Sequence, residues 1–213
     1  AIMMMARFQD SAINTMVELQ FRLSQQQDLS ASFIEVAPRR AVNELRALPG
    51  VRHVEGVRSV PVRFRSENRS LLTSIEGLPP GGELRRPIDA QLRRIDLPDD
   101  GLVLNDYLAA RLGVRVGDRV WVEVLEGRRA RLQLPVARLV REHVGLQAYM
   151  NLDALNRALG DGDVISGTLM TVDDGAEAAV FRELDRRPRI IGSASRLASV
   201  EALYKSIAQM TGL

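Results

Sequence analysis

The sequence predicts an α+β fold in which two βαβ-type repeats carry a smaller, β-rich α/β module between them. Three observations predict this fold. Two similar segments, at residues 32–51 and 168–191, each place a stretch of helical apolar spacing between two short apolar runs. A strand-rich segment separates them, and both chain ends show a long amphipathic pattern. A repeat that is split by an insertion indicates one discontinuous domain carrying a second one.

The chain begins with a long amphipathic pattern. Apolar residues recur at spacings of three and four from residue 2 to residue 26, which predicts one long helix, and residues 200–210 repeat the pattern. Two such helices can pack together as a stalk, or they can cover the sheet of a free-standing domain. The unbroken apolar run Ile2–Met5 favours the stalk, because it resembles the tail of a longer hydrophobic segment. The apolar positions are Met5, Phe8, Ala12, Met16, Leu19 and Leu23, and then Val200, Leu203, Tyr204, Ile207 and Met210.

Each repeat predicts a strand, a helix and a strand. In the first repeat, the run Ser32–Val36 precedes a helix that ends before Gly50, and a second strand starts at Val51. In the second, Thr168–Val172 precedes a helix that stops at Pro188, and a last strand follows. The helical apolar positions are Val42, Leu45 and Leu48 in the first repeat and Val180, Phe181 and Leu184 in the second.

The segment between the repeats predicts a strand, a capped helix and a hairpin. Residues 102–104 form the strand, Asn105 caps the helix, and Gly113 ends it in the left-handed conformation that needs no Cβ. After a turn at 116–118, apolar and polar residues alternate on both sides of Gly127, as in two half-buried strands joined by a hairpin. The alternating apolar residues are Val120, Val122 and Val124, then Ala130, Leu132, Leu134 and Val136.

The order of short motifs along the chain resembles that of a known family. The motifs are Leu48-Pro49-Gly50-Val51, Ile75-Glu76-Gly77-Leu78, Leu97-Pro98 with Gly101 to Leu104, then Leu108-Ala109, Leu112-Gly113-Val114 and Gly117-Asp118. Their order and spacing, over nearly the whole chain, resemble the extracytoplasmic domain of FtsX-like and MacB-like ABC transporter permeases. The resemblance implies a porter-like domain with an inserted sabre-like domain, held between the first two transmembrane helices of the permease.

The resemblance implies a division of the chain and a function. We expect an N-terminal stalk helix at 1–30, the halves of the porter-like domain at 31–95 and 165–196, the inserted domain at 96–164 and a C-terminal stalk helix at 197–213. The implied function couples cytoplasmic ATP-driven motion to the handling of an envelope substrate, a lipid, lipoprotein or peptide, or of a periplasmic partner. The chain is not expected to be an enzyme, because ATP hydrolysis belongs to a separate ATP-binding cassette subunit or domain.

The resemblance also implies partners and a location. The partners are the ATP-binding cassette ATPase, the transmembrane part of the same permease, a second permease copy, and a lipid, lipoprotein or periplasmic protein. The location is the extracytoplasmic side of the bacterial inner (cell) membrane, in the periplasm, as part of a multi-pass membrane protein. No apolar run in the 213 residues approaches the roughly 18 to 20 that a spanning helix needs, so such segments would lie outside this sequence.

Arginine dominates the basic residues. Of the 29 basic residues all but Lys205 are arginine, yet 27 acidic residues leave a net charge of only +2, and aromatic residues are 4% of the chain. A nucleic-acid partner is therefore not expected, because such binders concentrate positive charge and interleave aromatic residues. The arginine pairs within the Pro-Gly-rich connection from Gly81 to Arg94 are candidates for a lipid or partner contact. The pairs along the chain are Arg39-Arg40, Arg85-Arg86, Arg93-Arg94, Arg128-Arg129 and Arg186-Arg187.

We predict no catalytic, cofactor-binding or metal-binding residues. A phosphate-binding Walker loop needs glycines before its lysine, and Lys205 has none nearby. Without cysteine, a zinc site would need His53 and His143 together with carboxylates such as Glu55 or Glu142, and both histidines are interpreted as ordinary ones. The sequence Asp161-Gly162-Asp163 lacks the later glutamate of a calcium loop and is interpreted as a turn that follows the helix 153–159.

Two alternatives stay open. The chain could be a free-standing soluble ligand-binding protein that captures an apolar ligand in a cleft between its two modules, since clefts between domains are common ligand sites. It could also be an enzyme with an unrecognised pair of carboxylates, although nothing in the sequence indicates which two would meet.

Overall fold

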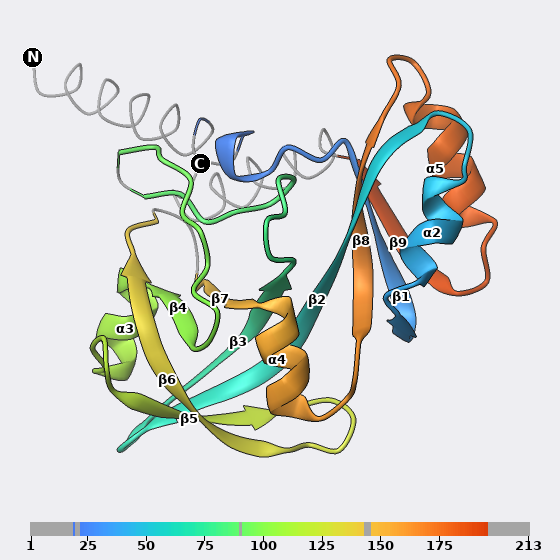
Figure 1. Cartoon of the computed structure of the whole chain (residues 1–213). Helices are drawn as coiled ribbons and strands as arrows, with labels where there is room; N and C mark the ends of the chain where they lie inside the picture. Colours follow the sequence, from blue (N-terminus) through green and yellow to red (C-terminus); the bar gives the residue numbers. More distant parts are fainter. Residues whose placement is uncertain (1–18, 20–21, 90, 143–145, 196–213) are drawn as a thin grey trace, which may run out of the picture.

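The computed structural model describes residues 19, 22–89, 91–142 and 146–195 (Figure 1). Most of the predicted N-terminal stalk helix and all of the predicted C-terminal one, residues 197–213, lie outside these ranges. So does His143, which was considered as a zinc ligand. Residues 22–24 are helical, and Gln25 leaves the helix to form a β-bridge with Arg85. The described helical residues therefore end before residue 26, where the apolar spacing ends, and β1 already begins at Leu29, inside the range 1–30 given to the stalk helix. No helix within the described ranges is long and apolar enough to cross a bilayer.

Six strands close into a small barrel (Figure 1). Around the ring the order is β2, β3, β7, β4, β6 and β5, and β5 pairs back onto β2. Apolar side chains fill the interior, because alternate residues of each strand point inward. The helices α3 and α4 pack onto the same core through their buried leucines and alanines. The bounds are β2 Val51–Ser66, β3 Arg69–Leu78, β4 Leu102–Asn105, α3 Asp106–Leu112, β5 Arg119–Val124, β6 Arg131–Val140, β7 Ala148–Asn151 and α4 Leu152–Leu159.

The remaining strands form a four-stranded antiparallel sheet with the first part of β2. Its order is β2, β8, β1 and β9, and α2 and α5 pack onto one face through a second apolar core. Each predicted repeat is present as strand, helix and strand, but the repeats interleave: β8 lies between β1 and β2, and β1 lies between β8 and β9. This is the split βαβ arrangement. The bounds are β1 Leu29–Pro38, α2 Ala41–Arg46, β8 Val164–Val172, α5 Glu177–Asp185 and β9 Ile190–Ser195.

The strand β2 belongs to both units. Residues 51–57 pair with β8 in the sheet, whereas residues 58–66 pair with β3 in the barrel. At about 3.3 Å per residue, its 16 residues span roughly 50 Å. A third apolar cluster lies under residues 79–101, the connection from β3 to β4, and includes residues from both units. The barrel and the sheet are thus joined by one continuous strand and by a shared core.

Local signals for helix ends and hairpins hold in the structure. The side chain of Asn105 accepts a hydrogen bond from the Leu108 backbone N–H at 2.9 Å and begins α3. Gly113 ends that helix at a φ of 71°. The strands β5 and β6 pair as the predicted antiparallel hairpin, with Val122 opposite Leu132.

Gly167 allows β8 and β1 to approach each other closely. A Cβ added at this residue would lie 2.6 Å from the carbonyl oxygen of Ala31, which is a backbone atom and cannot rotate away. We expect Gly167→Ala to lower the free energy of unfolding by about 1 to 3 kcal/mol, because the strands must separate to admit the methyl group. Urea denaturation measures this change.

The matched control for that measurement is Gly192→Ala in β9, where an added Cβ meets no atom within 4 Å. We expect this control to be neutral or slightly stabilising, since alanine has less backbone freedom to lose on folding. Equal effects of the two substitutions would refute the close approach of β8 and β1.

Candidate functional site at the junction of barrel and sheet

Arg58 lies where β2 passes from the sheet into the barrel. Val57 pairs with Gly167 of β8, and Arg58 pairs with Gly77 of β3. Although it is an arginine, its side chain is only 2% exposed. A buried guanidinium is costly to desolvate unless acceptors surround it. The partners of Arg58 therefore determine how the two units meet.

Three separate elements supply those partners. Arg58 donates hydrogen bonds to the Asn156 side-chain oxygen at 2.7 Å and to the Asp161 carboxylate at 2.6 Å. The Glu126 carboxylate, on the turn between β5 and β6, lies 3.6 Å away as an ion-pair partner. Asn156 also donates to the Val164 backbone carbonyl at 2.9 Å. The cluster joins α4, the hairpin and the segment that leads into β8, so it fixes the position of all three around β2.

Arg39 makes a second tie between the same regions. It follows β1 and forms ion pairs with Asp153 of α4 and with Asp163, the latter at 2.7 Å. Its backbone N–H also donates to the Asp163 carbonyl at 3.0 Å. The predicted turn at 161–163 is present, and its two carboxylates bind two different arginines. The sequence interpretation missed this role of the turn.

Period-two alternation in β2 is the signal that could have identified Arg58. The even-numbered residues of the strand from 54 to 64 are all buried. Arg58 occupies one of these inward positions, between the apolar neighbours Gly56 and Val60. An arginine at an inward position of an alternating strand must be paired, and this reasoning would have selected it from the other arginines.

Glu55 ties the connection between β3 and β4 to β2. Its buried carboxylate accepts hydrogen bonds from the backbone N–H groups of Glu83 at 2.7 Å and Leu84 at 3.2 Å. His53 lies 3.0 Å from the same carboxylate. In the described parts of the chain, no three histidine or carboxylate side chains group in a way that could hold a metal ion.

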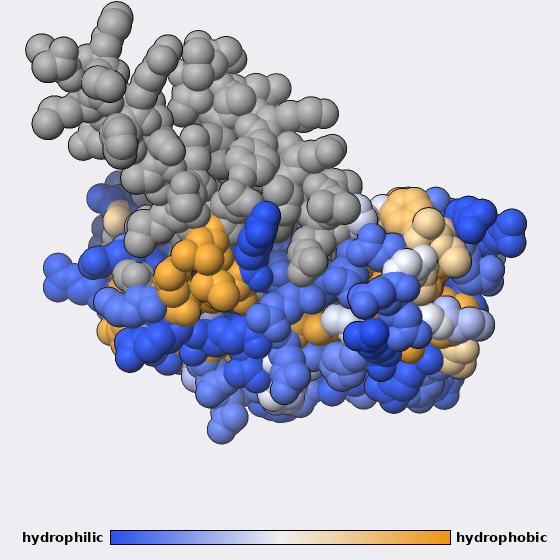
Figure 2. Space-filling model, turned by 90° about the horizontal axis from the view of Figure 1, so that it is seen from above, coloured by the Kyte–Doolittle hydropathy of each residue, from blue (hydrophilic) through white to orange (hydrophobic). Residues whose placement is uncertain are grey.

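The arginine pairs of this connection make contacts near their own position in the chain. Arg85 lies 3.6 Å from Glu76, Arg86 pairs with Asp96, and Arg93 pairs with Asp89 at 2.9 Å. Arg94 donates to the Glu83 carbonyl at 2.6 Å. The face seen in Figure 2 is mostly hydrophilic, with a few apolar clusters. These contacts give the predicted Gly81 to Arg94 connection a structural role.

Glu142 is a half-buried carboxyl group beside Tyr149. The Tyr149 hydroxyl donates to both carboxylate oxygens at 3.0 and 3.1 Å, and the Ile88 N–H contributes a longer contact of 3.4 Å. Burial raises the pKa of Glu142 to about 7, and the nearby charge of Asp106 adds to this effect, while the two hydrogen bonds oppose it. Burial and the carboxylate also raise the pKa of Tyr149. The sequence analysis considered Glu142 and His143 as possible zinc ligands. Of these two, only Glu142 lies within the described residues.

No family model matches the chain, and no curated protein matches it. Among solved structures, the chain is similar to the extracellular domain of the noncanonic ABC-type transporter YknZ from Gram-positive bacteria. The TM-score is 0.47 at 11% identity, over 78% of this chain and 100% of that one. The chain is also similar to the periplasmic region of MacB from Actinobacillus actinomycetemcomitans, with a TM-score of 0.49 at 12% identity, over 87% of this chain and 95% of that one.

Removal of the buried charge at Arg58 should destabilise the fold strongly. We expect Arg58→Met to lower the free energy of unfolding by about 3 kcal/mol, because Asp161 and Asn156 lose their donor. Arg63→Met is the matched control on the same strand, since Arg63 is 37% exposed and lies 3.5 Å from Glu123. The control should cost less than about 1 kcal/mol. Chemical denaturation measures both changes, and equal losses would contradict the role given to Arg58.

The raised pKa of Glu142 predicts a pH-dependent stability. The folded state holds the proton up to about pH 7, whereas the unfolded carboxyl group releases it near its ordinary pKa of 4.5. The stabilisation is complete below the unfolded pKa and is lost as the pH rises towards 7. Glu142→Gln should therefore be more stable than the unchanged chain at pH 8, by roughly 3 kcal/mol at most, and equal to it near pH 4.

Thermal unfolding across this pH range tests the expectation. Glu44→Gln, at an exposed residue of α2, controls for the loss of one negative charge. A difference between Glu142→Gln and the unchanged chain that does not vary with pH would show that the carboxyl group does not titrate in this window.

Proposed function

We propose that this chain is the extracytoplasmic domain of an ABC transporter permease and that it passes motion from the membrane to an envelope substrate or a periplasmic partner. The proposal joins the motif order to one observation on the fold. Leu29, at the start of β1, pairs with Ser195, at the end of β9. The chain therefore enters β1 and leaves β9 at neighbouring residues, at one end of the four-stranded sheet. This observation carries the proposal.

A defined set of contacts leads from these ends to the barrel. β1 runs from Leu29 to Pro38, and Arg39 directly after it is tied to α4 and to the turn before β8. Arg58 ties that same turn to β2 and to the barrel. Movement of one chain end against the other would act on β1 and β9 first, and through these ion pairs on the barrel. Mechanical coupling requires an element with two states, and in the proposal these ion pairs would belong to it.

We also propose the division into modules. The sheet would be the porter-like unit and the barrel the inserted unit, so that the barrel takes in residues 58–78 besides the predicted 96–164, and the spatial boundary lies between Val57 and Arg58. Strands β2 and β3, which lie within residues 31–95, contribute to the barrel. In the proposed function the partners are the transmembrane part of the same permease, its ATP-binding cassette ATPase and, in the assembled transporter, a second permease copy.

The cavities at the junction do not favour capture of an apolar ligand between the two units. One of about 430 Å³ and one of about 350 Å³ lie there, and both include Arg39 and Asp163, which already pair with each other. Charged and amide side chains make up much of both linings. The coupling function therefore has more support than the free-standing binding protein.

The proposal is tested by reading the coding sequence for about 50 codons beyond each end of this chain. We expect roughly 20 consecutive apolar residues before Ala1 and again after Leu213, the length that spans a bilayer. Stop signals or polar sequence on both sides would refute the permease assignment.

A second test addresses the coupling in the complete permease with its ATPase, reconstituted in vesicles. Arg58→Met should leave ATP hydrolysis present and lower the rate of substrate transport, because the ion pair between Arg58 and Asp161 is lost. Arg63→Met should leave both at the level of the unchanged protein. An unchanged rate of substrate transport in Arg58→Met would contradict the proposal that motion reaches the barrel through Arg58.

A further inference from the structure

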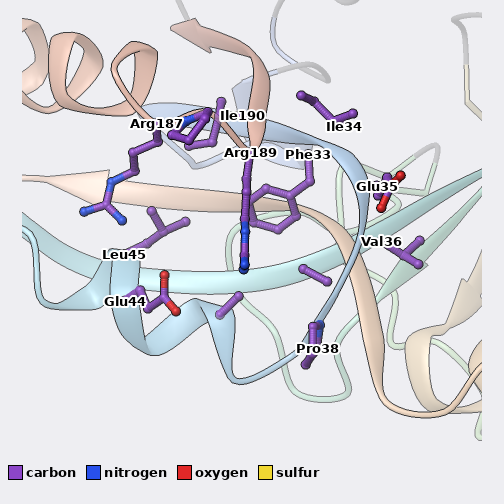
Figure 3. A pocket seen from close by; sticks show the side chains of 13 residues that line it. Phe33, Ile34, Glu35, Val36, Pro38, Glu44, Leu45, Arg187, Arg189 and Ile190 are labelled. Carbon is purple, nitrogen blue, oxygen red and sulfur yellow. The ribbon is translucent and has the colours of Figure 1, made fainter.

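A cavity of about 620 Å³ lies beside the last residues of β1 (Figure 3). Its walls are Phe33 to Pro38 of β1, the α2 residues Ala41 and Leu45, and the segment from Arg187 to Ile190 that joins α5 to β9. The volume falls within the range of roughly 300 to 1,000 Å³ that is usual for small-molecule sites.

Irregular pairing of β1 creates this hollow. β1 pairs regularly with β8 up to Ser32 and again from Ala37, and the register shifts between these two residues. Its pairing with β9 extends only to Phe33. The intervening backbone therefore bows away from its neighbours. In Figure 3 this part of β1 and the start of α2 curve around the cavity.

The walls are mainly apolar, and the apolar surface continues outside the cavity. Phe33, Ala41 and Leu45 are partly or fully buried in the wall. Ile34 and Val36, at the rim, are 58% and 45% exposed. Large apolar side chains that remain exposed beside a cavity are a favourable contact for a hydrocarbon chain.

Two arginines provide positive charge at the same cavity. Figure 3 shows the Arg189 side chain reaching across the cavity beside Phe33, and the Arg187 side chain on the side of Leu45. Arg187 is partly buried and Arg189 is exposed, and among the described residues neither forms an ion pair. Of these two arginines, only Arg187 has a buried Nε without a hydrogen-bond acceptor. Guanidinium groups in this state suit a carboxylate or phosphate, to which they donate two parallel hydrogen bonds.

Two glutamates also line the rim. Glu35 and Glu44 are exposed, and in the described part of the chain no cation lies within ion-pair distance of either. Water screens these exposed charges more than it screens the partly buried Arg187. The two glutamates would weaken the attraction for an anion without cancelling it. Removal of one of these negative charges should therefore tighten the binding of an anion.

We propose that this cavity binds a single-chain anionic amphiphile, with the acyl chain along Phe33, Ile34 and Val36 and the acidic head on Arg187 and Arg189. The inference deepens the proposed function and rests on it only for the orientation. Phe33 pairs with Ile190, at the opposite end of the β1–β9 pair from Leu29 and Ser195. In the proposed permease the lipid would thus be held at the end of the sheet that is remote from the chain ends.

Binding is measured on the full 213-residue chain by titration with laurate below its micellar concentration. The comparison ligands are dodecanol, which has the same chain length without the charge, and inorganic phosphate, which has charge without the chain. We expect saturable laurate binding that is at least ten-fold tighter than dodecanol binding, and no measurable competition by millimolar phosphate. Absence of saturable laurate binding overturns the proposal, and so does equal binding of dodecanol or of phosphate.

Variants locate the site. Arg189→Gln and Arg187→Gln should each weaken laurate binding about ten-fold and leave dodecanol binding unchanged, whereas Glu44→Gln should tighten laurate binding. Arg186→Gln, at the exposed neighbour that does not line the cavity, is the matched control and should have no effect. Laurate binding that is the same in all four variants places the ligand elsewhere and refutes the site.

The result is independent of the membrane assignment. Laurate binding together with polar flanking sequence would support the site and refute the permease function. Apolar flanking sequence on both sides without laurate binding would support the permease function and refute the site.

Discussion

The buried guanidinium of Arg58 is the constraint on which the arrangement of this protein depends. A charge at 2% exposure requires acceptors, and these come from α4, from the β5–β6 turn and from the turn before β8. Each of these elements could otherwise move with its own unit. Because all three converge on one side chain in the middle of β2, the barrel and the sheet meet in one defined way.

The connectivity explains why this position matters. Two chain segments pass between the units near Arg58: β2 itself, between residues 57 and 58, and the segment from α4 to β8. The ion pair between Arg58 and Asp161 joins them, and Arg39 adds the end of β1 to the same place. Rotation of the barrel against the sheet would have to separate the buried Arg58 from the partly exposed Asp161, and Arg39 from the exposed Asp163.

The sequence predicted the elements better than their closure. The cap at Asn105, the left-handed Gly113 and the β5–β6 hairpin are local features, so a single stretch of sequence contains the whole signal. The barrel depends on pairs such as Val62 with Val124 and Ile75 with Ala148, which are far apart in the chain. An alternating strand shows the same pattern in an open sheet and in a closed ring, so closure could not be predicted. Arg58 was not selected from the many arginines of the chain, although the alternation of apolar residues in β2 places it at an inward position.

The most direct measurement is the distance between the two units in solution. The chain has no cysteine, so Val116→Cys on the barrel and Ile191→Cys on β9, both at exposed residues, can carry one spin label each. Double electron–electron resonance should give one narrow distance distribution in the otherwise unchanged chain. The same labels with Arg58→Met should give a broad or divided distribution, and Arg63→Met should preserve the narrow one. A distribution that Arg58→Met leaves unchanged would contradict the claim that this buried charge holds barrel and sheet together.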